Sequence, residues 1–124
     1  MKKKYQEFGE YIAEKRKSRA IALREMARQL GFSAPFWSDV EKGRANPPKY
    51  GKLVQIAEIL NFTLEEKTLM FDLAGQGRAS IAPDIKEFII NNGYVTKAFR
   101  KVIGLGANEN DWNDFINNLR RKNA

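Results

Sequence analysis

Side chains suited to binding an anionic polymer recur between Arg24 and Lys49. Lysine, arginine and asparagine side chains suit phosphate oxygens, which position a protein on nucleic acid without reading its sequence. Alanine can touch the methyl group of thymine, and aspartate can accept from the amino group of cytosine. The candidate binding residues are Ser33, Ala34, Pro35, Ser38, Asp39, Lys42, Arg44, Asn46 and Lys49, with Gln29 and Arg24 as further phosphate candidates.

The residue types that several other chemistries require are missing from the 124 residues. The chain has no Cys and no His, which excludes zinc fingers, thiol nucleophiles, disulfides and acid–base catalysis by imidazole. Glu41 has no accompanying acid or metal set, and neither Gly75-x-Gly77 nor Gly104-x-Gly106 follows a strand as a nucleotide loop does. We therefore expect no enzyme activity, no cofactor and no metal.

The segment from Leu23 to Pro48 predicts two short helices joined by a tight turn. Gly31 tolerates the left-handed conformation that ends a helix, Ser33 can cap the next helix, and Gly43 closes it. Two helices that cross steeply over such a turn form a helix-turn-helix, whose second helix can enter a DNA major groove. The first helix is expected at Leu23–Leu30 with Met26, Ala27 and Leu30 on its inner face, and the second at Ala34–Lys42 with Trp37, Val40 and Glu41 inward.

The stretch from Phe8 to about Gly75 resembles the lambda-repressor-like, XRE-type helix-turn-helix family. The matching segments are FGEYIAEKRKSR, LREMARQLGFSAPFWSDVEKGR, NPPKYGKLVQIAEIL and FTLEEKTLMFDLAG. The resemblance implies an all-α, five-helix DNA-binding domain in which Arg16 and Glu41 form a structural ion pair. Ala22 departs from the family, which has Thr or Ser at this N-cap. An alanine there costs on the order of 1 kcal/mol and removes a hydroxyl that can contact phosphate.

The same resemblance implies that Ala34, Pro35 and Asp39 reach base edges. Alanine and proline form no bidentate hydrogen bonds but can touch thymine methyl groups, and Asp39 can accept from a cytosine amino group. The alternative is that Ala34 and Pro35 only begin the helix and that Asp39 faces solvent. Trp37 takes the family's buried aliphatic position, which leaves its neighbour Phe36 partly exposed.

Basic residues follow the second motif helix, and two interpretations of them stay open. They either contact phosphate oxygens or form an ordinary solvated loop. The formal net charge of the chain is +7 at pH 7 and its pI is near 9.7, and a basic surface attracts nucleic acid through counterion release. The residues of this segment are Lys42, Arg44, Asn46, Lys49 and Lys52.

The chain divides by composition into two helical parts. We expect the DNA-binding domain over residues 1–75, a linker containing glycine and proline over 76–83, and a C-terminal helical extension over 84–124. No strand pattern of convincing length is present. Thr63 and Glu66 have the spacing of a capping box. The other helices are expected at Tyr5–Ser18, Tyr50–Leu60, Thr63 to Ala74 with Leu69, Met70 and Leu73 buried, Asp84–Asn92, Thr96 (as a cap) to Gly104, and Asn108–Lys122.

The C-terminal extension is too short to bury its amphipathic helices well by itself. Its apolar faces are expected to form a surface for a second copy of the chain or for a partner, and packing onto the fifth helix is the alternative. Dimerisation is favoured because a two-fold axis would also set the spacing of two half-sites. The residues of this surface are Phe99, Val102, Ile103, Trp112, Phe115, Ile116 and Leu119.

Together these features predict a sequence-specific transcriptional regulator of a bacterium or a bacterial mobile element, a repressor that binds operator DNA as a homodimer. Two alternatives are the antitoxin of a toxin–antitoxin pair, which would hold a neighbouring gene product, and a protein-interaction module on a helix-turn-helix scaffold. The apolar runs are too short to span a membrane, and the basic N-terminus lacks the apolar region of a secretory signal. We therefore expect a cytoplasmic location and no membrane partner.

Overall fold

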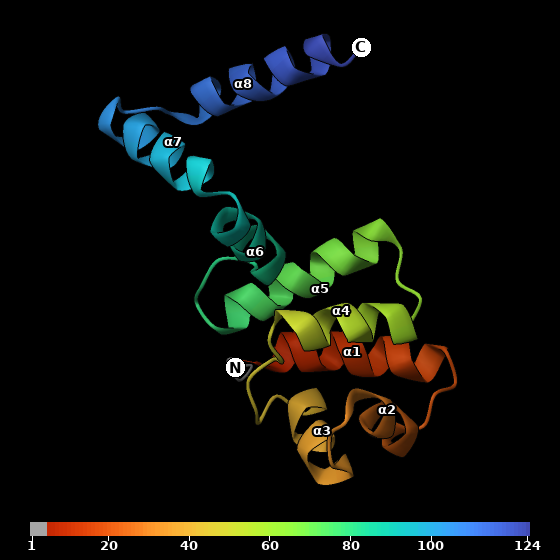
Figure 1. Cartoon of the computed structure of the whole chain (residues 1–124). Helices are drawn as coiled ribbons and strands as arrows, with labels where there is room; N and C mark the ends of the chain where they lie inside the picture. The colour runs from red at the N-terminus through yellow and green to blue at the C-terminus, as the bar shows by residue number, and fades with distance from the viewer. Residues whose placement is uncertain (1–4) are drawn as a thin grey trace. The chain divides into compact units, whose positions relative to one another are not determined.

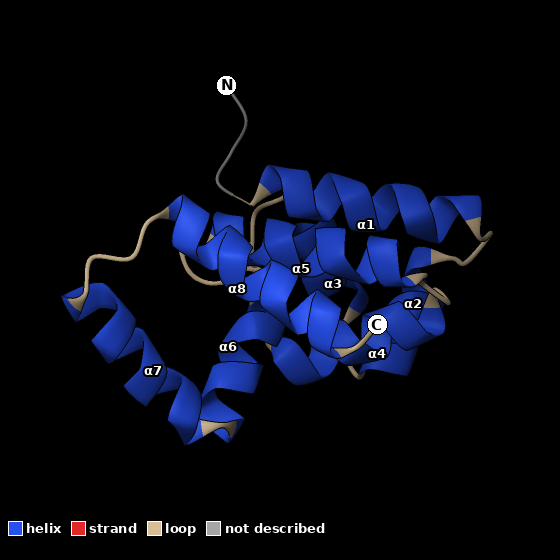
Figure 2. Ribbon diagram, turned by 90° about the horizontal axis from the view of Figure 1, so that it is seen from above, coloured by secondary structure: helices blue, strands red, loops and turns tan. Residues whose placement is uncertain are grey.

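The computed structural model describes residues 5–124, which form helices and connecting loops and no strand (Figures 1 and 2). The prediction of an all-α fold is thus confirmed. None of these helices is long and apolar enough to cross a membrane. The helices are α1 (Gln6–Ser18), α2 (Leu23–Leu30), α3 (Ala34–Glu41), α4 (Tyr50–Ile59), α5 (Leu64–Gly77), α6 (Pro83–Asn91), α7 (Gly93–Gly104) and α8 (Glu109–Lys122).

The N-terminal compact unit, which extends to Glu87, is built around one apolar core. Helix α1 packs against α3 and α5, α2 packs against α3 and α4, and α4 packs against α5. In the view of Figure 1, α2 and α3 lie below α1 and α5 lies above it. The buried core consists of Phe8, Ile12, Met26, Ala27, Leu30, Trp37, Val40, Leu53, Ile56, Ala57, Leu60, Phe62, Met70, Phe71 and Ala74.

The two motif helices begin and end as local chemistry requires. Helix α2 ends before Gly31, whose φ of 76° lies in the left-handed region that glycine tolerates. The Ser33 hydroxyl accepts the backbone N–H of Phe36 at 3.2 Å and so caps α3. Ala22 precedes α2 without a side-chain cap. The turn between the helices is therefore specified by its own residues.

Gly9 lets the backbone of α1 touch the end of α3. A Cβ atom at this position would lie 2.4 Å from the carbonyl oxygen of Glu41 and 2.5 Å from that of Val40. Both are backbone atoms, so any larger residue would push the two helices apart. The absence of a side chain at Gly9 thus fixes how closely the second motif helix approaches α1.

Helix α5 begins as the sequence predicts but ends later. Thr63 and Glu66 form the predicted capping box, since each side chain accepts the backbone N–H of the other residue. The helix was expected to end at about Ala74 and runs instead to Gly77. The first two residues of the predicted linker, 76–83, are therefore helical.

The buried face of α5 is displaced from the predicted one. The prediction that Leu69 is buried is wrong, because its side chain is 46% exposed. Met70 is buried as predicted, Leu73 is half-buried, and Phe71, which the sequence did not indicate, is buried. The ring of Tyr50 in α4 stacks on Phe71 with the centroids 5.7 Å apart. The contact with α4 thus selects the face of α5 that points inward.

The second compact unit, Phe88–Ala124, contains two well-defined helices. Helix α7 begins at Gly93, so the prediction that Thr96 caps it is wrong: this residue lies within the helix. Helix α8 is capped by Asn108 and Asp111, whose side chains accept each other's backbone N–H at 3.1 and 2.9 Å. The start of α8 is therefore stabilised by local interactions.

Apolar side chains of α7 and α8 remain exposed in the single chain. Neither helix contains a buried residue. The rings of Phe99 and Trp112 meet edge to face with their centroids 5.8 Å apart, and Trp112 and Phe115 do the same at 6.5 Å. We call the residues predicted for this surface the aromatic face: Phe99, Val102, Ile103, Trp112, Phe115, Ile116 and Leu119.

Candidate nucleic-acid interface

A buried ion pair joins the end of α1 to the end of α3. The Arg16 guanidinium donates from Nε to Glu41 Oε2 at 2.7 Å and from Nη2 to Glu41 Oε1 at 2.9 Å. Its Nη1 donates to the carbonyl oxygen of Ile21 at 2.7 Å. Both residues of the pair are only 7% exposed. Two parallel hydrogen bonds fix the angle of the helices as well as their distance.

Several contacts therefore hold α3 in one orientation on the unit. Trp37 and Val40 of α3 are buried in the core, Glu41 is bound by Arg16, and Gly9 lets α1 approach closely. The opposite side of α3 is left to solvent. A helix held in this way can present its outer residues to a ligand with little loss of conformational entropy on binding.

The start of α3 presents small and apolar side chains. Pro35 is exposed, Ala34 is half-buried, and the Phe36 side chain is 42% exposed. Trp37 is buried, as the sequence predicts for this pair of neighbours. The Phe36 ring meets the edge of Phe32 at a centroid distance of 5.0 Å. Of the predicted base-contacting residues, Ala34 and Pro35 thus lie in the first turn of α3, whereas Asp39 lies in its second half and is half-buried.

The loop after α3 is tied to Asp39. The backbone carbonyl of Asp39 accepts the N–H groups of Arg44 at 2.8 Å and Ala45 at 3.3 Å. The Asp39 carboxylate lies 3.8 Å from Arg44 Nη1. Lys42, Arg44, Asn46 and Lys49 are exposed. The structure therefore places Asp39, a predicted base-contacting residue, beside Arg44, a predicted phosphate-contacting residue.

Arg78 lies beside this basic loop and contacts it, and the sequence alone did not indicate this position. Its Nη2 donates to the carbonyl oxygen of Pro47 at 2.5 Å. Arg78, Arg44 and Lys49 line one surface groove together with Phe36. Arg78 was assigned to the linker, and 31 residues separate it from Pro47 along the chain. No local sequence signal could have found this contact.

The polar residues of α2 are mostly occupied with one another. Arg28 donates to Glu25, and Gln29 Nε2 donates to the same carboxylate at 3.0 Å. The hydrogen bonds from Arg28 lower the pKa of Glu25 to about 2. Lys52, predicted as a loop cation, donates to the carbonyl oxygen of Leu30 at 2.5 Å and so caps the end of α2. Arg24 is exposed.

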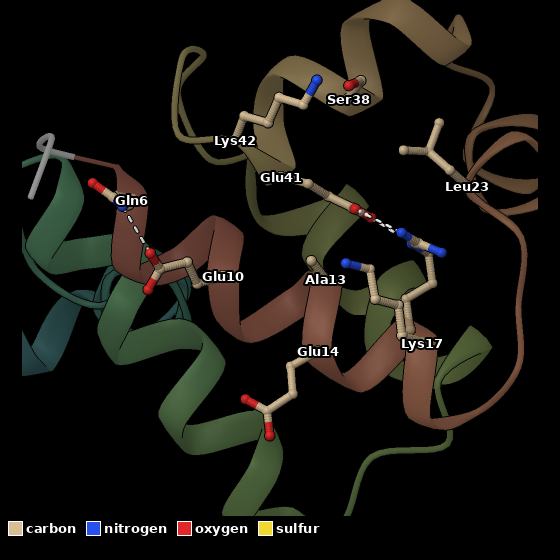
Figure 3. A pocket seen from close by; sticks show the side chains of 10 residues that line it. Gln6, Glu10, Ala13, Glu14, Lys17, Leu23, Ser38, Glu41 and Lys42 are labelled. Carbon is tan, nitrogen blue, oxygen red and sulfur yellow. Dashed lines mark hydrogen bonds and ion pairs between the residues drawn. The ribbon is translucent and has the colours of Figure 1, made fainter.

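A second groove lies between α1 and α3 (Figure 3). Ser38 of α3 and Lys42, which directly follows α3, line one side of it, and Ala13 and Lys17 line it from α1. Glu41 and Arg16 also line the groove, and a dashed line in Figure 3 marks the ion pair of Glu41. Ser38 therefore lies on the side of α3 that faces α1.

The side of α1 away from α3 is joined to α5 by charges. Lys15 Nζ lies 3.2 Å from Glu66 Oε2, and Arg19 Nη2 lies 2.9 Å from the same atom. The pKa of Glu66 is lowered to about 2, because its carboxylate accepts the backbone N–H of Thr63 and faces Arg19 and Lys15. Lys15 and Arg19 therefore help to hold α1 against α5.

The fold and this surface define the class of the protein. Two short helices, α2 and α3, cross over a tight turn. The inner face of α3 packs on the core and on α1, while its start and the basic loop that follows it are exposed. This is the geometry of a DNA-binding helix-turn-helix. A family model described as a helix-turn-helix domain matches residues 7–70, which is more than half of the chain. The chain belongs to this helix-turn-helix domain family.

Two curated proteins of Mycobacterium tuberculosis are similar to the chain. Both are named as uncharacterised HTH-type transcriptional regulators, one from strain CDC 1551 / Oshkosh and one from strain H37Rv. Each is 26% identical over 95 residues, which cover 77% of this chain. The match spans 65% of each relative, slightly less than two thirds of its length. No solved structure matches the chain significantly.

Proposed function

We propose that the chain is a sequence-specific, DNA-binding transcriptional regulator of bacterial origin that represses genes by occupying operator DNA in the cytoplasm. The observation that carries this proposal is the fixed orientation of α3, whose start is exposed beside a basic loop while a buried ion pair holds its end. The names of the two mycobacterial relatives agree with such a role. The protein would act by blocking other proteins from the DNA, with no chemistry of its own.

Within the helix-turn-helix class, we assign the chain to the lambda-repressor-like, XRE-type subtype. The five helices of the N-terminal unit and the pair of Arg16 with Glu41 support this assignment. The proposed domains remain 1–75 for DNA binding and 84–124 for assembly. The proposed base readers are Ser33, Ala34, Pro35, Ser38 and Asp39, and the proposed phosphate contacts are Lys42, Arg44, Asn46, Lys49, Gln29 and Arg24.

We propose further that the aromatic face joins two copies of the chain. Its side chains are exposed in the single chain except for the half-buried Val102, and exposed apolar patches of this kind mark interaction sites. The ends of α8 carry opposite charges: Glu109 and Asp111 lie in its first turn, and Arg120, Arg121 and Lys122 in its last. Two antiparallel copies of α8 would place each acidic end beside a basic one, as a two-fold axis allows.

A second candidate function follows from the same face. Exposed aromatic rings also suit a different protein, so the chain can be the antitoxin that represses its own operon and holds the product of a neighbouring gene. Sedimentation separates the two functions. The full chain at about 100 µM, where even weak dimers form, sediments as a dimer under the first proposal and as a monomer under the second.

Selection of bound duplexes from random DNA tests the central proposal. We expect the full chain to enrich one sequence and to prefer it by about 10³ or more over random competitor, with an affinity that falls steeply as salt rises. A preference below about tenfold would contradict operator binding. In that case a protein-interaction module on the helix-turn-helix scaffold would be the better description.

A further inference from the structure

We infer that the motif recognises thymine methyl groups in the major groove through an apolar tip formed by Ala34, Pro35 and Phe36. This inference rests on the proposed function, because it names the kind of base pair that the DNA-binding helix selects. The three residues occupy the first turn of α3, and the first residues of a recognition helix contact base edges. The C5-methyl group of thymine is the apolar group that base pairs present in this groove.

The polar side chains of this helix either cap it, as Ser33 does, or follow its first turn, as Ser38 and Asp39 do. The Ser33 hydroxyl caps the helix at 3.2 Å, and the Asp39 carboxylate lies 3.8 Å from the guanidinium of Arg44. Ser38 lines the groove between α3 and α1 (Figure 3). Pro35 has no backbone N–H to donate. The start of α3 therefore offers a base pair mainly methyl, methylene and ring carbons.

The apolar tip is held in place by the core. Phe36 meets the edge of Phe32, and Phe32 stacks on the buried Trp37 at a centroid distance of 6.1 Å. Lys52 Nζ lies 5.3 Å over the Phe32 ring. A row of rings thus runs from the core to the surface. A ring fixed in this way loses little freedom when a ligand covers it.

The charges around the apolar tip favour DNA as its ligand. Arg44, Lys49 and Arg78 line one groove together with Phe36, and Lys42 directly follows α3. The floor of the major groove carries the thymine methyl groups and is bordered by two rows of phosphates. A small apolar tip within a basic border complements that arrangement. We therefore expect the selected half-site to contain neighbouring thymines where α3 enters the groove.

Base analogues test this inference on the full chain. Deoxyuridine differs from thymidine only by lacking the C5-methyl group. Replacing one contacted thymine should weaken binding about fourfold, the equivalent of one apolar carbon removed from the interface. Deoxyuridine outside the half-sites should have no effect and serves as the control. At the same positions, a duplex with 5-methylcytosine should bind more tightly than one with cytosine, by a similar factor.

Variants of the apolar tip assign the effect to its residues. Pro35→Ala and Phe36→Ala change exposed side chains, and each should reduce the deoxyuridine penalty at one position. Asp72→Ala changes an exposed side chain of α5, outside the proposed interface, and is the control that should leave the penalty unchanged. If Pro35→Ala and Phe36→Ala both keep the full penalty, the methyl groups are recognised elsewhere and the assignment to the apolar tip is wrong.

The outcomes separate this inference from the proposed function. Specific binding that is unchanged when deoxyuridine replaces every thymine of the half-site would overturn methyl recognition and leave the regulator intact. Failure to select any sequence would overturn the proposed function and this inference with it, and would point to a protein ligand for the apolar tip. Selected half-sites without thymine at the contacted positions would also contradict the inference.

Discussion

Helices α5 and α8 are alike as isolated helices and differ in what they bury. Each has 14 residues and begins with a capping box, formed by Thr63 and Glu66 in α5 and by Asn108 and Asp111 in α8. Helix α5 contributes Met70 and other residues to the core, whereas α8 has no buried residue. Capping residues and apolar periodicity are therefore enough to form a helix. Whether its apolar face is buried depends on a second surface, which another element of the chain or another molecule must provide.

The same difference divides the two compact units. The N-terminal unit has a core, a buried ion pair and a fixed recognition helix, so its structure is determined within one chain. The unit Phe88–Ala124 has one helix with a capping box, α8, and an exposed aromatic face. We therefore expect substitutions in the first unit to act mainly on folding and DNA binding, and substitutions in the second to act on assembly.

The largest effect is expected from Glu41→Ala. This substitution leaves the Arg16 guanidinium buried without its partner, which costs roughly 3–5 kcal/mol for a buried pair. A loss of that size is a large part of the stability of a small domain, so denaturant unfolding should show the N-terminal unit unfolded or nearly so. Glu14→Ala removes an exposed carboxylate from the same helix pair and is the control. An unchanged unfolding midpoint for Glu41→Ala would show that the ion pair does not hold α3.

The next effect concerns the aromatic face. Phe115→Asp combined with Ile116→Asp places two charges on a surface that we propose to be buried between copies, where each side chain contributes about 1.5–3 kcal/mol. Sedimentation should change from a dimer to a monomer of 14.2 kDa, while the melting of the N-terminal unit stays the same. Asn117→Asp, on the polar side of α8, should keep the dimer. A dimer that survives the double substitution would place the interface elsewhere.

A smaller effect distinguishes phosphate contacts from base readers. Arg44→Ala and Arg78→Ala should each weaken binding to every duplex and reduce the slope of log affinity against log salt by about one. Asp39→Ala should instead change which sequences are selected. Arg100→Ala, in α7, serves as the control and should leave both properties unchanged. A full salt slope in the Arg78 variant would remove Arg78 from the interface.

The smallest effect is the pH dependence of the contact between α1 and α5. The folded pKa of Glu66, about 2, is below its ordinary value of 4.5, so its carboxylate stabilises the fold above pH 4.5. That stabilisation is lost as the pH falls from 4.5 towards 2. Glu66→Gln should therefore melt at a lower temperature than the parent at pH 6, and the gap should close in acid. A gap that is constant with pH would contradict this role for the carboxylate.

Local signals carried most of the predictable structure. Gly31, Ser33 and the capping box of Thr63 with Glu66 act within a few residues of themselves, so their roles follow directly from the sequence. Thr96 failed as a cap because the helix had already begun at Gly93. Helix boundaries depend on such competition between neighbouring signals.

The features that could not be predicted from the sequence depend on contacts between residues far apart in the chain. Leu69 and Phe71 are both apolar, and only the ring of Tyr50 shows which of them faces inward. Arg78 reaches Pro47, and Lys52 reaches Leu30, across long stretches of chain. The pairing of Arg16 with Glu41 was expected only from a family resemblance. Their charges alone do not identify them as partners.

The measurement that tests the account most directly is the change in amide chemical shifts when the full chain is titrated with its selected duplex. We propose that DNA contacts the start of α3 and the basic loop that follows it. We expect the largest changes between Ser33 and Lys49 and at Arg78, with those of α8 unaffected. Chemical-shift changes confined to α7 and α8, with no change in α3, would contradict this placement of the DNA.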